Sequence, residues 1–371
     1  MELSLIFGKN LRAARKRTGR TQKELGDLLG YSEKAISKWE CGGGIPPVVE
    51  LVRLAALLQV SIDELLSAGN EAKYFLGIDG GGTKTAFLLQ RADGVEVASC
   101  VLGPSNPNDV GMDACFSVLS EGISAVTAGI DRFEIAAFAG IAGGGLSGNN
   151  AALIGAFLKK QGFAYAENGS DVENAIEAAL HGENGVAVIA GTGSIAFSQE
   201  NGVQHRVGGW GYLLDGAGSG YDIGRDALTA VSRALDGRGR ETVLSGALQA
   251  ALGASFYDAI PTIYNGGKRL IASLAPIVFD AARTGDAVAL EIVQKNAAYI
   301  AELIAVAHGQ LRDKRAPAVV IGGLANHQDL LSPLIRAKIP ADIVVKFETE
   351  HMIKGAVARA ERGYYEQYRK A

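Results

Sequence analysis

Cysteine is scarce in this sequence. Its three cysteines, Cys41, Cys100 and Cys115, are scattered, and they form no CxxC pair and no zinc-ligand spacing. A disulfide framework or a cysteine-ligated metal site would require paired or clustered cysteines. The pattern therefore argues against both and predicts a reducing, cytoplasmic location.

Long hydrophobic runs are missing as well. No apolar run in the sequence approaches the length that crosses a bilayer. The first residues, Met1 to Ser4, contain no basic segment followed by an apolar stretch, which an export signal would have. We therefore expect no membrane partner.

Positive charge is in short supply outside the N-terminus. The net charge is −4, yet residues 9–38 hold nine lysines and arginines against three acidic residues, a local charge of +6. The rest of the chain must then carry −10. This asymmetry predicts a polyanionic partner for the N-terminal segment alone.

Glycine, in contrast, is abundant, with 49 residues in a chain of 371, well above average usage. The length predicts two or three domains. Glycine is needed where the backbone approaches a ligand closely or takes positive φ. We expect many such turns, alongside ordinary short loops of an α/β fold.

The first seventy residues have a helical pattern. Apolar residues between positions 3 and 14 recur on one face and predict a first helix. Thr21, followed three residues later by Glu24, predicts a capping box at the start of a second helix. Gly30 suits the end of that helix because it has no side chain.

The same pattern continues beyond this glycine. Ser32 is the expected N-cap of a third helix over residues 33–40, and the glycines and prolines that follow break the chain. A fourth helix is predicted over about 47–58, and a short fifth helix is capped by Ser61. Two short helices joined through one glycine turn are typical of a helix-turn-helix.

The segment 11–66 resembles the Cro/repressor-type helix-turn-helix family, whose members bind DNA, usually as dimers on palindromic operators. The resemblance implies operator DNA as a partner and a homodimer. The alternative is a small helical bundle with a solvated charged face. The residues placed to donate to phosphates or to read base edges are Gln22, Ser32, Glu33, Lys34, Ser37 and Lys38.

Two strand–glycine–strand units follow. Residues 74–78 read as a buried strand that leads into Asp79-Gly80-Gly81-Gly82-Thr83-Lys84 and a second strand over 86–90. Residues 186–190 lead likewise into Gly191-Thr192-Gly193-Ser194 and a strand over 195–198. Neither unit is a Walker loop or a dinucleotide fingerprint, since both of those open a helix. Each predicts a hairpin that offers N–H groups and hydroxyls to phosphate; a tight hairpin without chemistry is the alternative.

A third element, residues 319–324, is a strand followed by Gly322-Gly323 and then a predicted helix over about 328–338. The repetition of the first two units about 110 residues apart indicates a duplicated domain. The glycine pair would let a nucleoside approach the backbone.

Together these elements resemble the actin, hexokinase and heat-shock chaperone ATPase superfamily, and within it the N-acetylglucosamine kinase branch of the BadF/BadG/BcrA/BcrD ATPase family. The resemblance covers residues 74 to about 360. It implies an α/β fold of duplicated, ribonuclease H-like halves with an interdomain cleft, with ATP and Mg²⁺ as cofactors. The motifs that carry it are GIDGGGTKT (77–85), PSNPN (104–108), AGIAGGG (139–145), SDVENA (170–175), AGTGS (190–194), GGWGYLL (208–214), GSGYDIGRDAL (218–228) and VIGGL (320–324).

The resemblance also implies residue roles. Asp171 matches the family's catalytic aspartate, which accepts a proton from the attacking sugar hydroxyl, although it also suits a helix N-cap. Asp79 would position Mg²⁺ through water. The expected ATP and phosphate ligands are Asp79, Gly81, Gly82, Thr83, Lys84, Gly191, Thr192, Gly193, Gly322 and Gly323. The expected sugar ligands are Asn106, Ser194, Gly209, Trp210, Gly211 and Asp215.

One motif departs from the family pattern. The family usually reads GDEGS after the tryptophan loop, and that aspartate binds the sugar. This chain reads Asp215-Gly216-Ala217-Gly218-Ser219, with the acid one place early and the glutamate replaced by alanine. A one-residue shift in an extended segment turns a side chain to the opposite face. The sequence therefore supports two hypotheses: an amino-sugar kinase fused to a DNA-binding module, or a non-enzymatic regulator that senses sugar or nucleotide.

The expected domain organisation has five parts. They are a helix-turn-helix domain over 1–68, a linker over 69–73, ATPase subdomains over 74–184 and 185–348, and a C-terminal helix over 349–371 that packs back on the first ATPase subdomain.

Overall fold

The computed structural model describes residues 3–66, 72–145, 149–215, 217–349 and 352–369. Contacts divide the chain into two compact units, Met1–Ser170 with Arg359–Ala371, and Asp171–Ala358. Most of the predicted linker, residues 69–71, and Gly216 of the altered motif lie outside the described residues.

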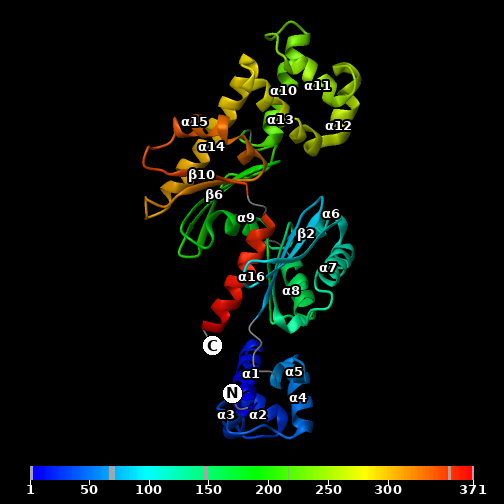
Figure 1. Cartoon of the computed structure of the whole chain (residues 1–371), viewed down its shortest axis with the longest axis vertical. Helices are drawn as coiled ribbons and strands as arrows, with labels where there is room; N and C mark the ends of the chain where they lie inside the picture. The colour runs from blue at the N-terminus through cyan, green and yellow to red at the C-terminus, as the bar shows by residue number, and fades with distance from the viewer. Residues whose placement is uncertain (1–2, 67–71, 146–148, 216, 350–351, 370–371) are drawn as a thin grey trace. The chain divides into compact units, whose positions relative to one another are not determined.

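The N-terminal part is all helical, as predicted (Figure 1). Thr21 and Glu24 form both halves of the capping box, and Gly30 ends its helix with φ 79°. Ser32 accepts from the Ala35 N–H at the next helix. These local contacts confirm the predicted helix ends. The helices are α1 (Leu3–Arg17), α2 (Gln22–Leu29), α3 (Glu33–Glu40), α4 (Val48–Leu58) and α5 (Ile62–Leu66).

These five helices enclose a hydrophobic core of their own, which runs from Phe7 to Leu65. A buried ion pair braces it, since the Arg15 guanidinium donates to the Glu40 carboxylate at 2.5 and 3.0 Å. A core confined to these residues is what an independently folding domain requires.

The first sheet has the order β3-β2-β1-β4-β5. The pairs β3–β2 and β2–β1 are antiparallel, and the pairs β1–β4 and β4–β5 are parallel. Its strands are β1 (Tyr74–Gly80), β2 (Thr85–Arg91), β3 (Glu96–Leu102), β4 (Ile135–Ile141) and β5 (Tyr165–Gly169).

The second sheet repeats this plan. Read from its other edge, the order is β8-β7-β6-β9-β10, with two antiparallel pairs followed by two parallel pairs. Strand order and direction therefore coincide in the two sheets, which confirms the predicted duplication. The strands are β6 (Gly185–Ala190), β7 (Ser194–Glu200), β8 (Val203–Val207), β9 (Ala318–Ile321) and β10 (Val345–Glu348).

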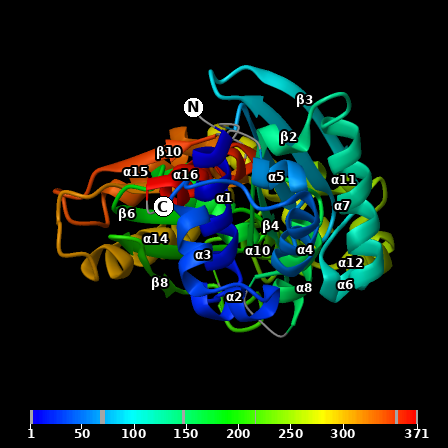
Figure 2. The same ribbon diagram turned by 90° about the horizontal axis from the view of Figure 1, so that it is seen from below.

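Helices cover both faces of the first sheet. Leu76 and Ile78 face α7 (Met112–Val126) and α8 (Asn150–Lys159), whose apolar residues complete one core. Figure 2 labels both helices in a second view of the ribbon. On the other face, Phe75 packs against Tyr364 of α16 (Met352–Arg369), with ring centroids 6.4 Å apart. The short elements of this unit are α6 (Pro107–Val110) and the 3-10 turn η1 (Arg132–Glu134).

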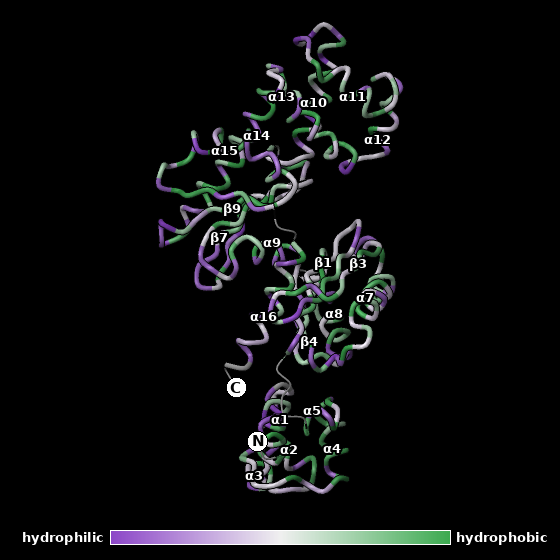
Figure 3. The backbone as a smooth tube through the Cα atoms, viewed as in Figure 1, coloured by the Kyte–Doolittle hydropathy of each residue, from purple (hydrophilic) through white to green (hydrophobic). Residues whose placement is uncertain are grey.

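The second sheet is sandwiched in the same way. Val186 and Val188 face the core formed with α10 and α14, whereas Ala187 faces α9. The fully buried strands β4 and β9 each lie next to the central strand of their sheet, β1 and β6 respectively. Figure 3 colours the backbone of the chain by hydropathy. The helical elements of this unit are α9 (Asp171–Leu180), α10 (Gly220–Leu235), α11 (Leu244–Leu252), α12 (Phe256–Ser273), α13 (Ala275–Arg283), α14 (Ala287–Gly309), η2 (Gly323–His327) and α15 (Gln328–Arg336).

The contact-based division differs in position from the sequence-based boundaries at 184/185 and 348/349. It falls at 170/171 because α9 packs against β6 and β9 of the second sheet. It falls at 358/359 because α16 begins in the second unit and ends in the first. Across the described ranges, no helix is long and apolar enough to span a membrane.

Candidate functional site

The first glycine turn connects β1 to β2. Gly80 pairs with Thr85 in the register, so residues 81–84 form the turn, and Gly81 N–H donates to Lys84 O at 3.0 Å. Thr83 and Lys84 are exposed, and Asp79 is half-buried at the end of β1. The predicted hairpin is confirmed, and its tip presents one hydroxyl and one ammonium group to solvent.

A second loop packs directly on this turn. The Thr85 hydroxyl donates to Gly103 O at 2.8 Å and lies 2.8 Å from Ser105 Oγ, and Ser105 N–H donates to Gly81 O at 3.1 Å. A Cβ atom on Gly80 would lie 2.4 Å from Ser105 Oγ. The close approach explains why glycine occupies position 80.

Asn106, the predicted sugar ligand, continues the same loop. Its Oδ1 accepts from Asn108 N–H at 3.1 Å and its Nδ2 donates to the Asp109 carboxylate at 2.7 Å. Asn150 Nδ2 donates to Asn108 Oδ1 and to Gly143 O, at 3.2 and 3.0 Å. The PSNPN and AGIAGGG motifs are therefore neighbours, which sequence separation alone does not reveal.

The second glycine turn connects β6 to β7. Gly191 N–H donates to Gly193 O at 2.9 Å, and Gly191 O accepts from Gly220 N–H at the start of α10. Thr192 is exposed at the tip, whereas Ser194 is buried and donates to Ala217 O at 3.1 Å. Thr192 is thus presented like Thr83 in the first turn, while Ser194 holds the loop before α10.

Lys268 was not among the predicted ligands. Gly267 interrupts α12 with φ 53° and ψ −149°, and the Lys268 Nζ lies 3.6 Å from where a Cβ on Gly193 would be. The same Nζ lies 5.6 Å from the Tyr212 ring centroid. The structure thus brings a cation to the second glycine turn. The available signal was a glycine pair directly before two cations within a helical segment.

The tryptophan loop lies open to solvent. Trp210 is 67% exposed, with the Arg206 guanidinium 4.7 Å from its ring centroid. Asp215 accepts from Trp210 N–H at 2.6 Å and donates its own N–H to Gly211 O at 2.8 Å. Burial, followed by the hydrogen bond to Asp215, raises the pKa of Tyr299 to about 12. The displaced acid therefore binds its own loop. Gly209 and Gly211 on this loop have positive φ, 72° and 98°.

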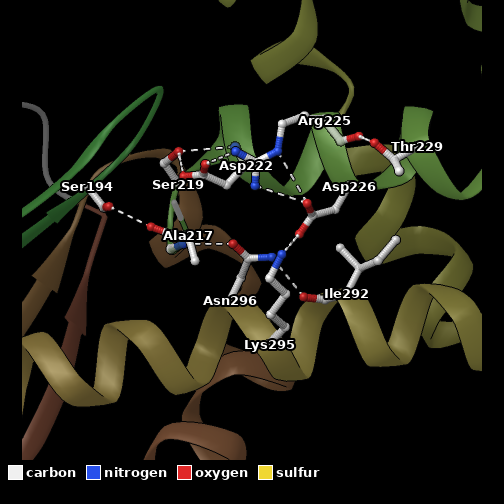
Figure 4. A network of polar contacts seen from close by, with 11 residues as sticks. Ser194, Ala217, Ser219, Asp222, Arg225, Asp226, Thr229, Ile292, Lys295 and Asn296 are labelled. Atoms are coloured by element: carbon white, nitrogen blue, oxygen red, sulfur yellow. Dashed lines mark hydrogen bonds and ion pairs between the residues drawn. The ribbon is translucent and has the colours of Figure 1, made fainter. Parts of the chain in front are cut away.

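A buried polar network fixes the segment after this loop (Figure 4). Asn296 of α14 accepts from Gly218 N–H at 2.7 Å. Ser219 donates to Asp222 at 2.5 Å and caps α10 by accepting from the Asp222 N–H. Asn296 was not predicted, because only the packing of α14 on this segment brings it to Gly218. Asp222 was not predicted either, although a serine followed three residues later by an acid is a local signal for a helix start.

The glycine pair after β9, Gly322-Gly323, lies close to the end of β6, the strand that leads into the second glycine turn. Gly322 has φ 106°, and a Cβ on it would lie 2.7 Å from Ala190 O. Both constraints require glycine. Gly323 opens η2 and has nothing within 4 Å of its ideal Cβ position, which leaves room beside the backbone for a ligand.

Asp171 begins α9, directly after the buried Ser170. Burial raises the pKa of its carboxyl, and hydrogen bonds from the Val172 and Asp171 N–H groups oppose the shift. The carboxylate thus stays close to the helix N-terminus, whose partial positive charge favours it. The sequence suggested two roles for Asp171, as the start of a helix and as a proton acceptor. Its position at the start of α9 is compatible with both.

The predicted DNA-contact residues lie on α2 and α3. Glu33, Lys34 and Lys38 are exposed along α3, and Ser37 is half-buried between them. Gln22 at the start of α2 donates to Glu40 at 2.7 Å. Ser32 is the N-cap of α3, so Gln22 and Ser32 also have structural roles.

Mg²⁺ was expected at Asp79, and the described residues bear on that expectation. Within them, no group of three or more histidine, cysteine, aspartate or glutamate side chains is arranged to hold a metal ion. Magnesium in phosphoryl-transfer sites needs only one or two carboxylates, since phosphates and waters complete its shell. Asp79, the carboxylate for which the sequence predicts this role, lies near the end of β1.

The decisive comparison is with a family model. Residues 76–357, three quarters of the chain, match the BadF/BadG/BcrA/BcrD ATPase family. The chain belongs to this family. Residues 11–65 separately match a helix-turn-helix model, so this member of the family carries an N-terminal helix-turn-helix domain.

Relatives that match the ATPase family region are named as sugar kinases. An N-acetylmuramic acid/N-acetylglucosamine kinase of Clostridium acetobutylicum is 31% identical over 283 residues, covering 70% of this chain and 88% of the relative. An N-acetyl-D-glucosamine kinase of Dictyostelium discoideum is 32% identical over 289 residues, covering 71% and 89%. The chain thus has a sugar kinase-like fold joined to a helix-turn-helix domain.

A solved structure extends the fold likeness to the whole chain. A ROK family transcriptional regulator, a homologue of the Escherichia coli MLC protein, superposes with a TM-score of 0.55 at 16% identity, covering 98% of this chain and 97% of its own. At this identity the likeness shows the fold alone.

Proposed function

We propose that this chain is an ATP-dependent kinase of N-acetylglucosamine or a related amino sugar, and that its helix-turn-helix domain binds operator DNA as part of a transcription regulator. The observation that carries the kinase half is the identity of about one third to two N-acetylhexosamine kinases across the ATPase domain. The helix-turn-helix match and the basic N-terminal segment support the regulatory half.

Each residue has a defined task in this proposal. Phosphoryl transfer requires an oriented nucleophile and neutralised phosphate charge rather than covalent chemistry by the protein. Asp171 accepts the proton of the sugar hydroxyl that attacks the γ-phosphate, and its raised pKa suits a base better than an ordinary aspartate. Thr83 and Thr192 donate to phosphate oxygens.

The remaining positions bind and orient. Lys268 adds positive charge beside the second turn, and Gly322-Gly323 admit the nucleoside. Asp79 would hold hydrated Mg²⁺, which neutralises the phosphate charge that develops during transfer. Asn106 and the Trp210 loop bind the sugar, because an aromatic ring beside polar groups suits a pyranose.

The second candidate is a sensor without turnover. Asp215, the acid nearest to the family's sugar-binding position, is held by Trp210 and Tyr299. A chain that has given up this sugar contact could still bind sugar or nucleotide and shift DNA affinity through differential binding to two conformations.

The experiment that separates the two is a coupled assay of ADP release by the full chain over a panel of hexoses and N-acetylhexosamines, with sugar binding measured in parallel by calorimetry. The kinase proposal expects sugar-dependent ADP release with at least one N-acetylhexosamine. Sugar binding without turnover on any member of the panel would overturn it and favour the sensor.

A further inference from the structure

A groove of about 520 Å³ lies in the second unit between α10, the loop that follows it, and α14. No residue predicted to bind ATP, sugar, metal or DNA lines it. Four cations do: Arg233, Arg238, Arg240 and Lys295.

The groove is positive in a negatively charged unit. Four cations and two acidic residues, Asp226 and Glu291, line it, and Asp236, outside the lining, pairs with Arg238. The unit as a whole, residues 171–358, has sixteen lysines and arginines against twenty aspartates and glutamates. A local excess of guanidinium and ammonium groups on such a background attracts anions.

Arg233 is the cation least neutralised by the protein. It donates to the carbonyl oxygen of Arg238 at 3.3 Å, and it pairs with no carboxylate within the described part of the chain. Arg240 pairs with Glu291, but the two side chains are 57% and 61% exposed. Exposed pairs of this kind contribute little, so an anion can replace the carboxylate at Arg240 at small cost.

The floor of the groove is apolar. Ala230 and Val288 are half-buried and Ile292 is buried there. Guanidinium groups bind phosphate through paired N–H donors, while an apolar floor favours a carbon skeleton attached to it. The lining therefore fits a phosphate ester of a small organic molecule.

We propose that this groove is a binding site for a phosphorylated small molecule. Arg233 and Arg240 hold its phosphate group, and Ala230, Val288 and Ile292 contact its carbon skeleton. The groove is separate from the residues proposed for ATP and sugar, so the proposal stands whether or not the chain is a kinase.

The groove is connected to the loop that precedes α10 (Figure 4). Lys295 donates to Asp226 at 2.7 Å, and Arg225 bonds to both Asp226 and Asp222, at 3.0 and 3.1 Å. Asp222 in turn accepts from Ser219 at 2.5 Å. A bound anion that draws Lys295 away from Asp226 leaves the Asp226 carboxylate to Arg225 alone. The contacts of Arg225 with Asp222, and of Asp222 with Ser219, then change as well. The groove is therefore suited to an effector that acts on the loop before α10.

The test is calorimetric titration of the full chain with N-acetylglucosamine 6-phosphate, with inorganic phosphate and with unphosphorylated N-acetylglucosamine. It is done at constant ionic strength with excess ADP present, so that nucleotide phosphate sites are occupied. Arg233→Gln and Arg240→Gln are compared with Arg315→Gln. Arg315 is a matched control because it is an exposed arginine, 93% accessible, paired with Asp313.

We expect saturable binding of a phosphorylated probe, weakened about tenfold by Arg233→Gln and by Arg240→Gln, with Arg315→Gln unchanged. Tighter binding of the ester than of inorganic phosphate assigns the site to esters; equal affinity assigns it to the free anion. Absence of saturable binding of either phosphate probe, or equal affinity in all three variants and the native chain, overturns the proposal. Arg240→Gln alters only an exposed ion pair, so we expect this variant to fold. It therefore still tests the proposal if Arg233→Gln does not fold.

Discussion

The Asp215 carboxylate accepts a hydrogen bond of 2.6 Å from the backbone N–H of Trp210, five residues earlier in the chain. Tyr299 of α14 bonds to the same carboxylate. The acid that the sequence placed among the sugar ligands therefore closes the tryptophan loop on itself and ties it to α14.

This relationship makes a prediction about loop order and sugar affinity. Asp215→Ala removes the acceptor for Trp210 N–H, so we expect sugar affinity to fall about three- to tenfold, the effect of losing one hydrogen bond. Asp215→Asn keeps an acceptor oxygen and should retain most of the affinity. Calorimetric titration with N-acetylglucosamine compares the variants. If Asn binds as weakly as Ala, the carboxylate charge itself contacts the sugar, and the loop-closing account is wrong.

Lys268 gives a prediction about nucleotide. Lys268→Met removes the ammonium group beside Gly193 and should weaken ATP binding about tenfold, since a hydrogen bond to a charged group contributes roughly 1.5–3 kcal/mol. Lys338→Met, an exposed lysine in the same unit, is the control and should bind as the native chain does. Fluorescence titration with a labelled ATP analogue measures both. Equal affinities for the two variants would remove Lys268 from the phosphate site.

The raised pKa of Asp171 gives a prediction about pH. A base acts when deprotonated, so kcat/KM should be constant above the pKa of Asp171 and fall as pH decreases through it. Because burial raises that pKa from its ordinary value of 3.8, the fall should begin at higher pH than for a solvated aspartate. A pH–rate profile whose acidic limb lies at or below 3.8 would contradict this placement.

The same shift predicts how Asp171→Asn affects stability. With a folded-state pKa above the unfolded one, the unfolded chain loses its proton first, so stability falls as pH rises from the unfolded to the folded pKa. Above both, the ionised carboxylate costs stability. Asp171→Asn removes this cost and keeps an acceptor for Val172 N–H, so the melting temperature at pH 7 should be equal or higher. A clear decrease would show that the charge stabilises the start of α9.

For DNA, the exposed cations of α3 should contact phosphates. Lys34→Ala combined with Lys38→Ala should reduce the slope of log K against log salt by about 0.9 per lost phosphate contact. Lys9→Ala on α1 serves as the comparison and should change the slope less. Fluorescence anisotropy with a random-sequence duplex over several salt concentrations provides the slopes. An unchanged slope in the double variant would mean that α3 does not face the DNA backbone.

Local signals in the sequence were sufficient for much of the fold. The Thr21–Glu24 capping box and the Ser32 cap depend on residues three apart, so composition and spacing reveal them. The two glycine hairpins are equally local, and their repetition predicted the duplicated sheets.

Long-range contacts were out of reach. Lys268 reaches Gly193 through a kink at Gly267 in a helix 75 residues away, and Asn296 reaches Gly218 across 78 residues. The unit boundary at Asp171 depends on which sheet α9 packs against. Such pairings follow from the packing of the helices on the sheets and leave no periodic pattern in the sequence.

The most direct test of the kinase account compares the native chain with Asp171→Asn, using ³¹P NMR to detect sugar phosphate formed from ATP and N-acetylglucosamine, with ATP affinity measured in parallel. The account predicts a sugar phosphate signal with the native chain, its loss in Asp171→Asn, and nearly equal ATP affinity in both. Sugar phosphate formed by Asp171→Asn at the native rate would contradict the role of Asp171 as the base. Its absence with the native chain, for N-acetylglucosamine and for every other amino sugar of the panel, would contradict the kinase itself.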